Sequence, residues 1–409
     1  MTPPLPVDVA AVEAARARLR GAVYQTPCPY SQTLSELTGA QCHLKLENLQ
    51  MTGSFKERGA ANLLLQLDEA ERRRGVVAAS AGNHGLAVAF HAARLGVPAT
   101  IVMPSYAPLV KVTSARRYGA EVVLHGTDYD EAYERARALE AERGAVFVHP
   151  FDDPRVIAGQ GTLALELLEQ VEGLDAVVVP VGGGGLVAGV AVALKARRPG
   201  VRVIGVQAAA IPAMRQALQA QTRVRVPAGA TIADGIAVRQ CGETTFALAA
   251  RLVDEIVTVD EEELANAVLL LLEIEKTVVE GAGAAPLAAL LHRPLGLAGR
   301  RVALVLTGGN IDVTMLARII ERGLVKDGRL VRLGVVLQDR PGALARLTAL
   351  IAEERVNILQ IEHDRAFSRQ AIGSSEVELT LETPGRKQID ALRARLEAAG
   401  YVVEERGLG

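Results

Sequence analysis

The 409-residue sequence has few of the residues that characterise several large classes of protein. It contains no tryptophan, and aromatic residues make up 3% of the chain, which argues against a platform that stacks on nucleic-acid bases. The three cysteines, Cys28, Cys42 and Cys241, are too few and too scattered for a disulfide scaffold or a zinc site. No uninterrupted run of about 18 apolar residues occurs, so we expect no membrane-spanning helix.

An excess of charge of either sign is also missing. The chain has 45 Lys and Arg residues against 47 Asp and Glu residues, which favours neither a nucleic-acid partner nor an anionic membrane. Residues 1–6 lack the basic and then apolar pattern of a signal peptide, so we expect a cytoplasmic protein. The length predicts two or three domains, and the hydrophobic content of 49% is typical of a globular chain.

Short β-branched runs alternate with alanine-rich helical stretches from Val76 onward. We predict strands at residues 76–79, 99–102, 121–124, 145–148, 176–179, 202–206, 255–259 and 302–306. Apolar strands separated by helices are typical of parallel sheets covered on both faces, so the expected fold class is doubly wound α/β. Ligands of such sheets bind beyond the carboxyl ends of the strands.

The last part of the chain follows a different pattern. Residues 323–329 form a polar connector bounded by glycine, and the expected elements after it follow the order βαββαβ. That order within about 80 residues predicts a ferredoxin-like domain. We therefore expect a main domain at residues 1–322, with a smaller subdomain at about 50–150 inserted in it, a linker at 323–329 and a separate domain at 330–409.

Lys56 occupies an unusual position for a cation. It lies in the run Gln50–Gly59, between a Gly-Ser turn and the start of a predicted helix, where the helix dipole disfavours positive charge. A lysine that is neutral, or condensed with a carbonyl group, escapes this penalty and can act as a nucleophile and a base. Considered alone, however, a lysine in this context is more often a surface residue.

A run of four glycines predicts an anion site. Gly182, Gly183, Gly184 and Gly185 follow the strand at 176–179, and with Leu186 they open a helix. Backbone N–H groups of consecutive glycines can converge on an anion at a helix N-terminus, so we favour phosphate binding over a merely flexible loop. The spacing is not that of a dinucleotide fold, and no Lys-Ser/Thr pair follows, so a single cofactor phosphate is a better match than ATP or NAD.

Two further loops follow predicted strands. In residues 80–85, Ser80, Asn83 and free N–H groups could bind a carboxylate or a cofactor hydroxyl, although helix capping is the better explanation of this loop considered alone. In residues 307–310, the hydroxyl of Thr307 could bond a ring nitrogen, or the segment could be a plain glycine turn. One lysine and three loops of this kind together fit pyridoxal 5′-phosphate.

Four segments, at residues 54–59, 80–85, 182–185 and 307–310, resemble those of the fold-type II pyridoxal-phosphate family, and within it the threonine dehydratases (threonine ammonia-lyases). The resemblance covers about residues 10–320 and implies two subdomains with parallel-type sheets. The implied cofactor contacts are a covalent bond to Lys56, packing of Phe55 on one ring face, the ring oxygen at Asn83, the phosphate at Gly182–Gly185 and Leu186, and the ring nitrogen at Thr307. For Phe55, an ordinary core position explains the residue equally well.

The resemblance also implies a reaction. The freed amine of Lys56 removes the α-proton of an amino acid, the β-hydroxyl leaves, and the product hydrolyses to a 2-oxo acid and ammonium. The neutral hydroxyl of Thr307 cannot hold the ring nitrogen protonated as a carboxylate would, which suits β-elimination better than transamination. The implied substrate-binding residues are Ser54, Ser80, Ala81, Gly82, Asn83 and His84, of which we interpret His84 as structural rather than as a base.

Two alternatives remain. A serine or amino-acid racemase of this family would need a hydroxyl where the chain has Ala81, and its metal-binding glutamate is replaced by Gln207, so we expect dehydration and no metal site. A non-catalytic amino-acid sensor would not need Lys56. For Glu280, at the start of a predicted helix, two interpretations are open: approach to the cofactor ring, or a favourable interaction with the helix dipole.

The C-terminal segment at 337–342, followed by Asn357, resembles an ACT domain, a regulatory module that binds amino acids. The resemblance implies an effector such as isoleucine at Asp339, Arg340, Gly342 and Asn357, near a domain interface. It also implies a homodimer or homotetramer.

Overall fold

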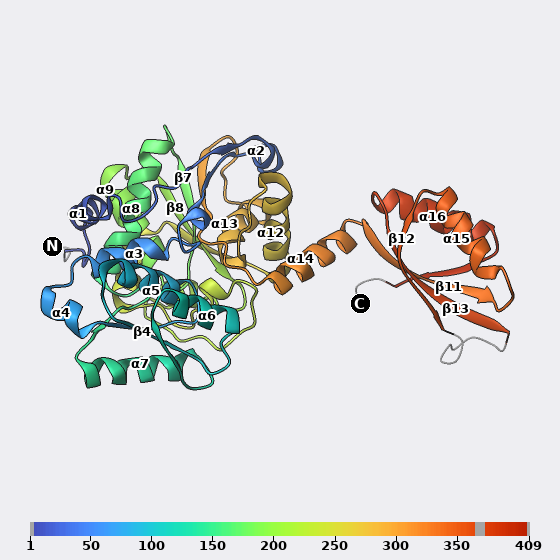
Figure 1. Ribbon diagram of the computed structural model, residues 1–409. Coiled ribbons are helices and arrows are strands. Elements are labelled where there is room, and N and C mark those ends of the chain that lie inside the picture. The colour runs from blue at the N-terminus through green and yellow to red at the C-terminus, as the bar shows by residue number, and fades with distance from the viewer. Residues whose placement is uncertain (1–3, 365–372, 407–409) are drawn as a thin grey trace. The chain divides into compact units, whose positions relative to one another are not determined.

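The computed structural model describes residues 4–364 and 373–406 (Figure 1). The chain divides into two compact units, Met1–Ile311 and Asp312–Gly409. Among the described residues, no helix combines the length and the apolar character that crossing a bilayer requires.

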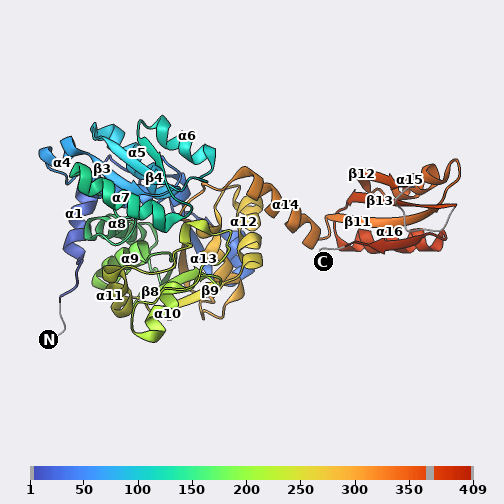
Figure 2. The same cartoon turned by 90° about the horizontal axis from the view of Figure 1, so that it is seen from below.

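The larger sheet of the first unit has the strand order β1-β2-β10-β7-β8-β9, and every neighbouring pair except β1–β2 is parallel. Its strands are β1 (Tyr30–Ser31), β2 (Gln41–Lys45), β7 (Ala176–Pro180), β8 (Arg202–Ala208), β9 (Glu255–Val259) and β10 (Arg301–Val305). The helices around it are α1 (Val9–Leu19), α2 (Gln32–Thr38), α8 (Pro154–Gln170), α9 (Gly185–Arg197), α10 (Ala213–Ala220), α11 (Glu243–Leu252), α12 (Glu261–Glu275) and α13 (Gly281–His292), with short 3-10 turns η1 (Glu47–Leu49) and η2 (Asp234–Ile236). Figure 2 shows α9 and α11 to one side of β8, and α12 and α13 to the other.

The smaller sheet of this unit has the order β5-β4-β3-β6, and all its pairs are parallel. Its strands are β3 (Val76–Ala79), β4 (Ala99–Met103), β5 (Glu121–Leu124) and β6 (Val146–Phe147), and its helices are α3 (Lys56–Leu64), α4 (Glu69–Arg74), α5 (Asn83–Leu95), α6 (Leu109–Arg117) and α7 (Tyr129–Arg143). The fully buried runs of β3 and β4 are what a parallel sheet covered by helices requires. The predicted doubly wound α/β fold is confirmed.

The second unit has one antiparallel sheet of order β12-β13-β11-β14. Its elements are α14 (Val313–Lys326), β11 (Leu330–Gln338), α15 (Ala343–Glu353), β12 (Asn357–Asp364), β13 (Ser374–Glu382), α16 (Arg386–Ala398) and β14 (Val402–Glu405), so the predicted βαββαβ order is confirmed. The boundary between the units precedes Asp312, whose side chain accepts from the N–H of Thr314 and caps α14. The connector expected at 323–329 is therefore the end of α14 and the turn before β11.

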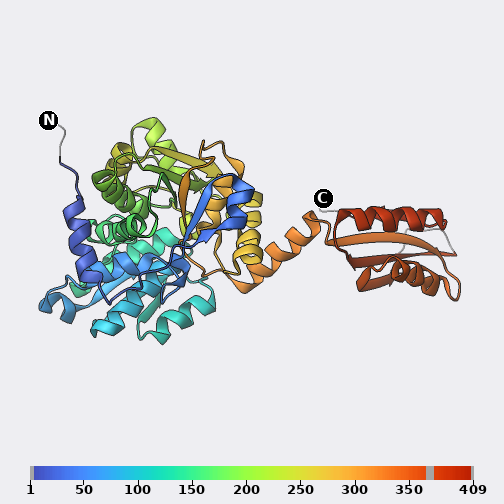
Figure 3. The ribbon, with the colours of Figure 1, turned by 90° about the horizontal axis from the view of Figure 1, so that it is seen from above.

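Helix α8 packs against α1, α3 and α9. The blue helix α1 lies beside the green α8 in Figures 1 and 3. A buried group of four charged residues joins α8 to α3: Lys45, Glu47, Arg58 and Glu166. The five N–H groups of Arg58 all find acceptors, which belong to Glu47, Glu166 and Thr162. Two cations and two carboxylates balance, so the group can be buried only as a complete set. It anchors α3, the helix that begins at Lys56.

Glu166→Gln removes one charge from this set and leaves two buried cations facing one carboxylate. We expect the free energy of unfolding to fall by about 3–5 kcal/mol. Glu169→Gln, on the same helix, breaks only the half-exposed pair with Arg16 and should cost less than about 1 kcal/mol. Urea denaturation of the two variants and the wild type measures the difference, and equal midpoints would contradict a structural role for the buried set.

Candidate active site

Lys56 is the first residue of α3 and its amine is partly buried. The Nζ atom donates to the carbonyl oxygen of Pro150 at 2.9 Å and lies 5.1 Å from the centroid of the Phe55 ring. Burial lowers the pKa of Lys56 to about 8, although the negative charge of Glu280 opposes the shift. Roughly a tenth of the amine is therefore neutral at pH 7, far more than for an ordinary lysine.

Backbone hydrogen bonds attach the lysine loop to the loop that follows β10. The N–H of Phe55 donates to the carbonyl of Thr307 at 3.0 Å, and the N–H of Gly309 donates to that of Gly53 at 3.0 Å. Ser54 lies between them in an antiparallel bridge with Gly308. The Ser54 hydroxyl is fully buried and has no hydrogen-bond partner among the described residues, so it is available to a ligand.

The glycine loop has room for an anion but not for side chains. Gly184, at φ +99°, precedes α9, whose first N–H groups have no partners within the helix. A Cβ atom at Gly183 would lie 2.4 Å from the ring of Phe151, and one at Gly185 would lie 2.8 Å from the carbonyl oxygen of the same residue. Gly182 is less confined, since its nearest neighbour would be 3.2 Å away, and Leu186 is buried behind the loop. The loop suits a single phosphate.

The loop at 80–85 begins α5 and contributes mainly through Asn83. Its Nδ2 donates to Glu280 at 2.8 Å, and its Oδ1 accepts from Asn310 at 2.8 Å. Ser80 accepts from the N–H of Gly82 at 3.1 Å and so also stabilises its own turn. His84 lies 2.8 Å from the carbonyl of Val148, and burial lowers the pKa of His84 to about 3, so this ring is neutral.

Two residues complete the ring end of the site. Thr307 is 2% exposed and lies two residues after the end of β10, as expected for a contact at the carboxyl end of a strand. Ala81 has no hydroxyl and packs partly against the core of the smaller sheet. The structure thus joins the lysine loop, the Asn83 loop and the Thr307 loop through hydrogen bonds. The segment that holds Pro150 and Phe151 joins the glycine loop to the lysine.

Known proteins match this chain over both units. A family model described as pyridoxal-phosphate dependent enzyme matches residues 19–308, and a model described as ACT domain matches residues 331–400. The chain belongs to the pyridoxal-phosphate dependent enzyme family. This membership confirms the predicted family and its cofactor.

Members of this family that are similar to the chain include two curated proteins named L-threonine ammonia-lyase. The one from Thermotoga maritima is 51% identical over 392 residues, which is 96% of this chain and 98% of the relative. The one from Geobacter sulfurreducens is 49% identical over 394 residues, with the same coverage. Among solved structures, a T.th. threonine deaminase is 44% identical with a TM-score of 0.71, covering 75% of this chain and 99% of its own. Maize serine racemase is 34% identical with a TM-score of 0.74, covering 78% and 98%.

One part of the site, the segment after β6, cannot be recognised from its residue types. The segment after β6 runs through the site: the carbonyl of Pro150 accepts from Lys56, and Phe151 lies against the glycine loop. The carboxylate of Asp152 then accepts from the N–H groups of Glu243 and Thr245. The contacts at the lysine and the glycine loop use a backbone carbonyl and close packing, which many residue types can supply, so sequence reasoning missed them.

Asp234 and Gln207 each bind other groups of the protein. Asp234 is paired with Lys111 at 3.1 Å near the surface. Gln207, at the position where the racemase alternative needs a glutamate, is buried, donates to the carbonyl of Val181 at 3.1 Å and accepts from the N–H of Arg215 at 2.9 Å. Both ends of its amide are therefore occupied by backbone.

The expected effector residues of the ACT unit do not lie together in one chain. Asp339, Arg340 and Gly342 follow the last residue of β11, whereas Asn357 begins β12 and donates to Glu382 at 3.1 Å. Both strands pair antiparallel with β13 and so run parallel to each other, which places the end of β11 away from the start of β12. The separation along the sheet is on the order of 25 Å.

The lowered pKa of Lys56 predicts how the protein without cofactor takes up pyridoxal 5′-phosphate. Only the neutral amine attacks the aldehyde, so the second-order rate should rise about tenfold per pH unit up to pH 8 and then level off. Stopped-flow absorbance between about pH 6 and pH 10 measures it. A rate that keeps rising to about pH 10.4 would mean that the lysine titrates as an exposed one.

Proposed function

We propose that this protein is a pyridoxal-phosphate-dependent L-threonine ammonia-lyase that also accepts L-serine. It converts threonine to 2-oxobutanoate and serine to pyruvate, with release of ammonia. The observation that carries the proposal is the partly buried Lys56 of lowered pKa, held among the three ligand loops in a chain of which 96% aligns with a named threonine ammonia-lyase.

The residues fit the cofactor. A phosphate suits the Gly182–Gly185 loop, because side chains there would collide with Phe151, and the first N–H groups of α9 point out of the helix. Asn83 would hold the ring oxygen, Thr307 the ring nitrogen and Phe55 one face of the ring, with Lys56 as the covalent attachment. When bound there, the cofactor supplies an electron sink for the pair of electrons left at the α-carbon of the substrate.

The chain's own groups then handle the proton and the substrate. The amine of Lys56, once the substrate has freed it from the cofactor, takes the α-proton in its neutral form. The carbonyl of Pro150 orients that amine by accepting a hydrogen bond from it. The unpartnered hydroxyl of Ser54 and the N–H group of Ala81 suit the substrate carboxylate, while Ser80 holds the turn by accepting the N–H of Gly82. His84 is neutral and structural.

The racemase alternative has one supporting observation, the similarity to maize serine racemase. Racemisation needs a proton donor on the second face of the α-carbon. The chain has Ala81 at the position of the hydroxyl that would serve there, and Ala81 packs partly against the core. Elimination therefore remains the favoured reaction.

Three measurements test the reaction. Purified wild type should show the visible band of a lysine-bound cofactor, and Lys56→Ala should lose that band and at least about a thousandfold of its turnover. Lys276→Ala, at an exposed lysine, is the control and should keep both. L-Threonine should yield 2-oxobutanoate faster than the enzyme interconverts L- and D-serine, and the reverse ranking would support the racemase.

We further propose that the ACT unit binds an amino-acid effector such as isoleucine between two copies. A single sheet keeps Asp339, Arg340 and Gly342 far from Asn357, so one site that uses all four residues needs the first three from one copy and Asn357 from another. Gly342, at φ +82°, opens α15. The N–H of Ala343 donates to the carbonyl of Arg340, so the N–H groups that follow it in the helix would be the ones offered to a carboxylate.

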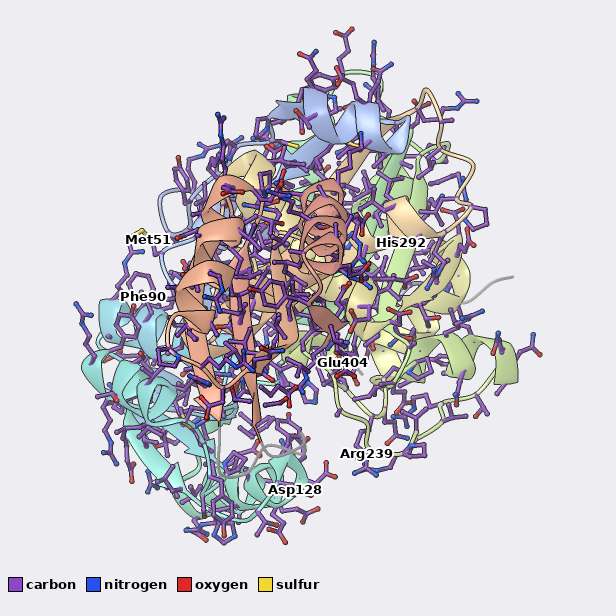
Figure 4. All side chains as sticks on the ribbon, turned by 90° about the vertical axis from the view of Figure 1, so that its right-hand side faces the viewer. Met51, Phe90, Asp128, Arg239, His292 and Glu404 are labelled. Atoms are coloured by element: carbon purple, nitrogen blue, oxygen red, sulfur yellow. The ribbon has the colours of Figure 1, made fainter. Side chains whose placement is uncertain are left out.

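A homodimer or homotetramer follows from this arrangement, and the first unit also has a surface suited to pairing. Phe90 and Tyr118 pack with ring centroids 5.3 Å apart, and Arg94 lies over Phe90 while donating to the carbonyl of Ala22. Figure 4 shows Met51, which is 66% exposed, and Phe90 pointing outward at the same edge. Met51 is exposed and Phe90 and Tyr118 are half-buried, and apolar surface of this kind favours association.

Deleting residues from Leu330 onward should leave threonine turnover but abolish the response to isoleucine. In the full chain, Asn357→Ala should weaken that response about tenfold, because one hydrogen bond to the effector is lost. Gln360→Ala, on the same strand with its amide directed to Glu362, is the matched control and should respond as wild type. A response to isoleucine that survives the deletion would place the effector site elsewhere.

A further inference from the structure

A continuous chain of hydrogen bonds crosses the site behind the expected position of the cofactor ring. The Nδ2 atom of Asn310 donates to the carbonyl of Thr52 and to the Oδ1 atom of Asn83, each at 2.8 Å. The Nδ2 atom of Asn83 donates in turn to Oε1 of Glu280 at 2.8 Å. Four segments that are distant in sequence meet in this chain.

The chain permits only one orientation of the Asn83 amide. Asn310 uses both Nδ2 hydrogens on oxygen acceptors, so Asn83 must present Oδ1 to it. Glu280 is an acceptor, so Asn83 must present Nδ2 to it. A flipped Asn83 would set nitrogen against nitrogen and oxygen against oxygen. One Nδ2 hydrogen of Asn83 remains for a ligand.

Several contacts also fix the position of Glu280. It is 4% exposed, precedes α13, and its own N–H donates to the carbonyl of Gly308 at 2.9 Å. A Cβ atom at Gly308 would lie 2.5 Å from Glu280 Oε1 and 3.0 Å from Asn83 Nδ2, so only glycine lets the pair meet there. The backbone N–H of Asn310 also donates to the carboxyl group.

The charges around Glu280 come from three elements. Burial and the charge of Asp234 of η2 raise the pKa of Glu280 to about 7, whereas the hydrogen bond from Asn83 and the charge of Lys111 of α6 lower it. The carboxylate of Glu280 in turn raises the pKa of Lys56 of α3. Glu280 can accept the hydrogen bond from Asn83 in either protonation state, because a neutral carboxyl group keeps its carbonyl oxygen.

We propose that Glu280 is a positioning residue for cofactor recognition: it orients Asn83 so that the remaining Nδ2 hydrogen is donated to the ring oxygen of pyridoxal 5′-phosphate. This role rests on the proposed function, because Asn83 is placed at the ring oxygen there. Asn310 supports the same amide from its other end.

The test measures cofactor affinity and does not depend on turnover. Protein freed of cofactor is titrated with pyridoxal 5′-phosphate and, separately, with 3-deoxypyridoxal 5′-phosphate, which lacks only the ring oxygen. Glu280→Ala and Asn83→Ala should each weaken binding of the natural cofactor about tenfold, the value of one hydrogen bond. With the deoxy analogue, both variants should bind within about twofold of wild type.

The double variant and a conservative one sharpen the result. Since Glu280 acts through Asn83, Glu280→Ala in the Asn83→Ala background should add less than about threefold. Glu280→Gln keeps an acceptor of the same length and should stay within about threefold of wild type. Glu263→Ala, which breaks a partly buried carboxylate–arginine pair remote from the site, is the control and should bind as wild type.

If Glu280→Ala fails to fold, Asn310→Ala serves instead, because it frees the other end of the Asn83 amide. This variant should show the same loss of affinity for pyridoxal 5′-phosphate and none for the deoxy analogue. Equal weakening toward both compounds, or independent effects of the two substitutions, would overturn the role of Glu280 while leaving the proposed function intact. A wild type that binds neither compound would instead overturn the proposed function.

Discussion

The backbone hydrogen bonds between residues 53–55 and 307–309 are the constraint on which the site depends. Phe55 and Gly309 donate across this junction. One side of it begins α3 and places Lys56, while the other follows β10 and places Thr307. The lysine and the residue proposed for the ring nitrogen therefore keep a fixed relation, because main-chain atoms rather than flexible side chains join them. The buried group of four charged residues around Arg58 also anchors α3.

Burial then sets the charge of the two ionisable groups nearest this junction. Removal from water disfavours the charged form of each, so the pKa of Lys56 is lowered to about 8 and that of Glu280 is raised to about 7. A nearby opposite charge keeps each shift moderate, Glu280 for the lysine and Lys111 for the carboxyl group. Both groups consequently change charge close to neutral pH, where proton transfer by a side chain is most efficient.

The sequence was sufficient for the fold and for the position of the loops at the ends of strands, because both follow from local pattern. Apolar strands predict a parallel sheet, and the carboxyl ends of parallel strands share one edge, so Asn83 and Thr307 were each expected at such an edge despite their distance along the chain. The pairing of Asn83 with Glu280 could not be predicted, because it depends on which side chains face each other across 197 positions. The contacts of Pro150 and Phe151 were equally inaccessible, since a carbonyl oxygen and a close approach leave no mark in residue type.

The boundary between the two units lies next to the loop that carries Asn310. Asp312, the cap of α14, comes two residues after Asn310, which orients Asn83. The first helix of the second unit, α14, begins at Val313, so two residues separate it from Asn310. Within that loop, Thr307 and Gly309 are held by the main-chain bonds of the junction, whereas the side chain of Asn310 is held by its bonds to Thr52 and Asn83.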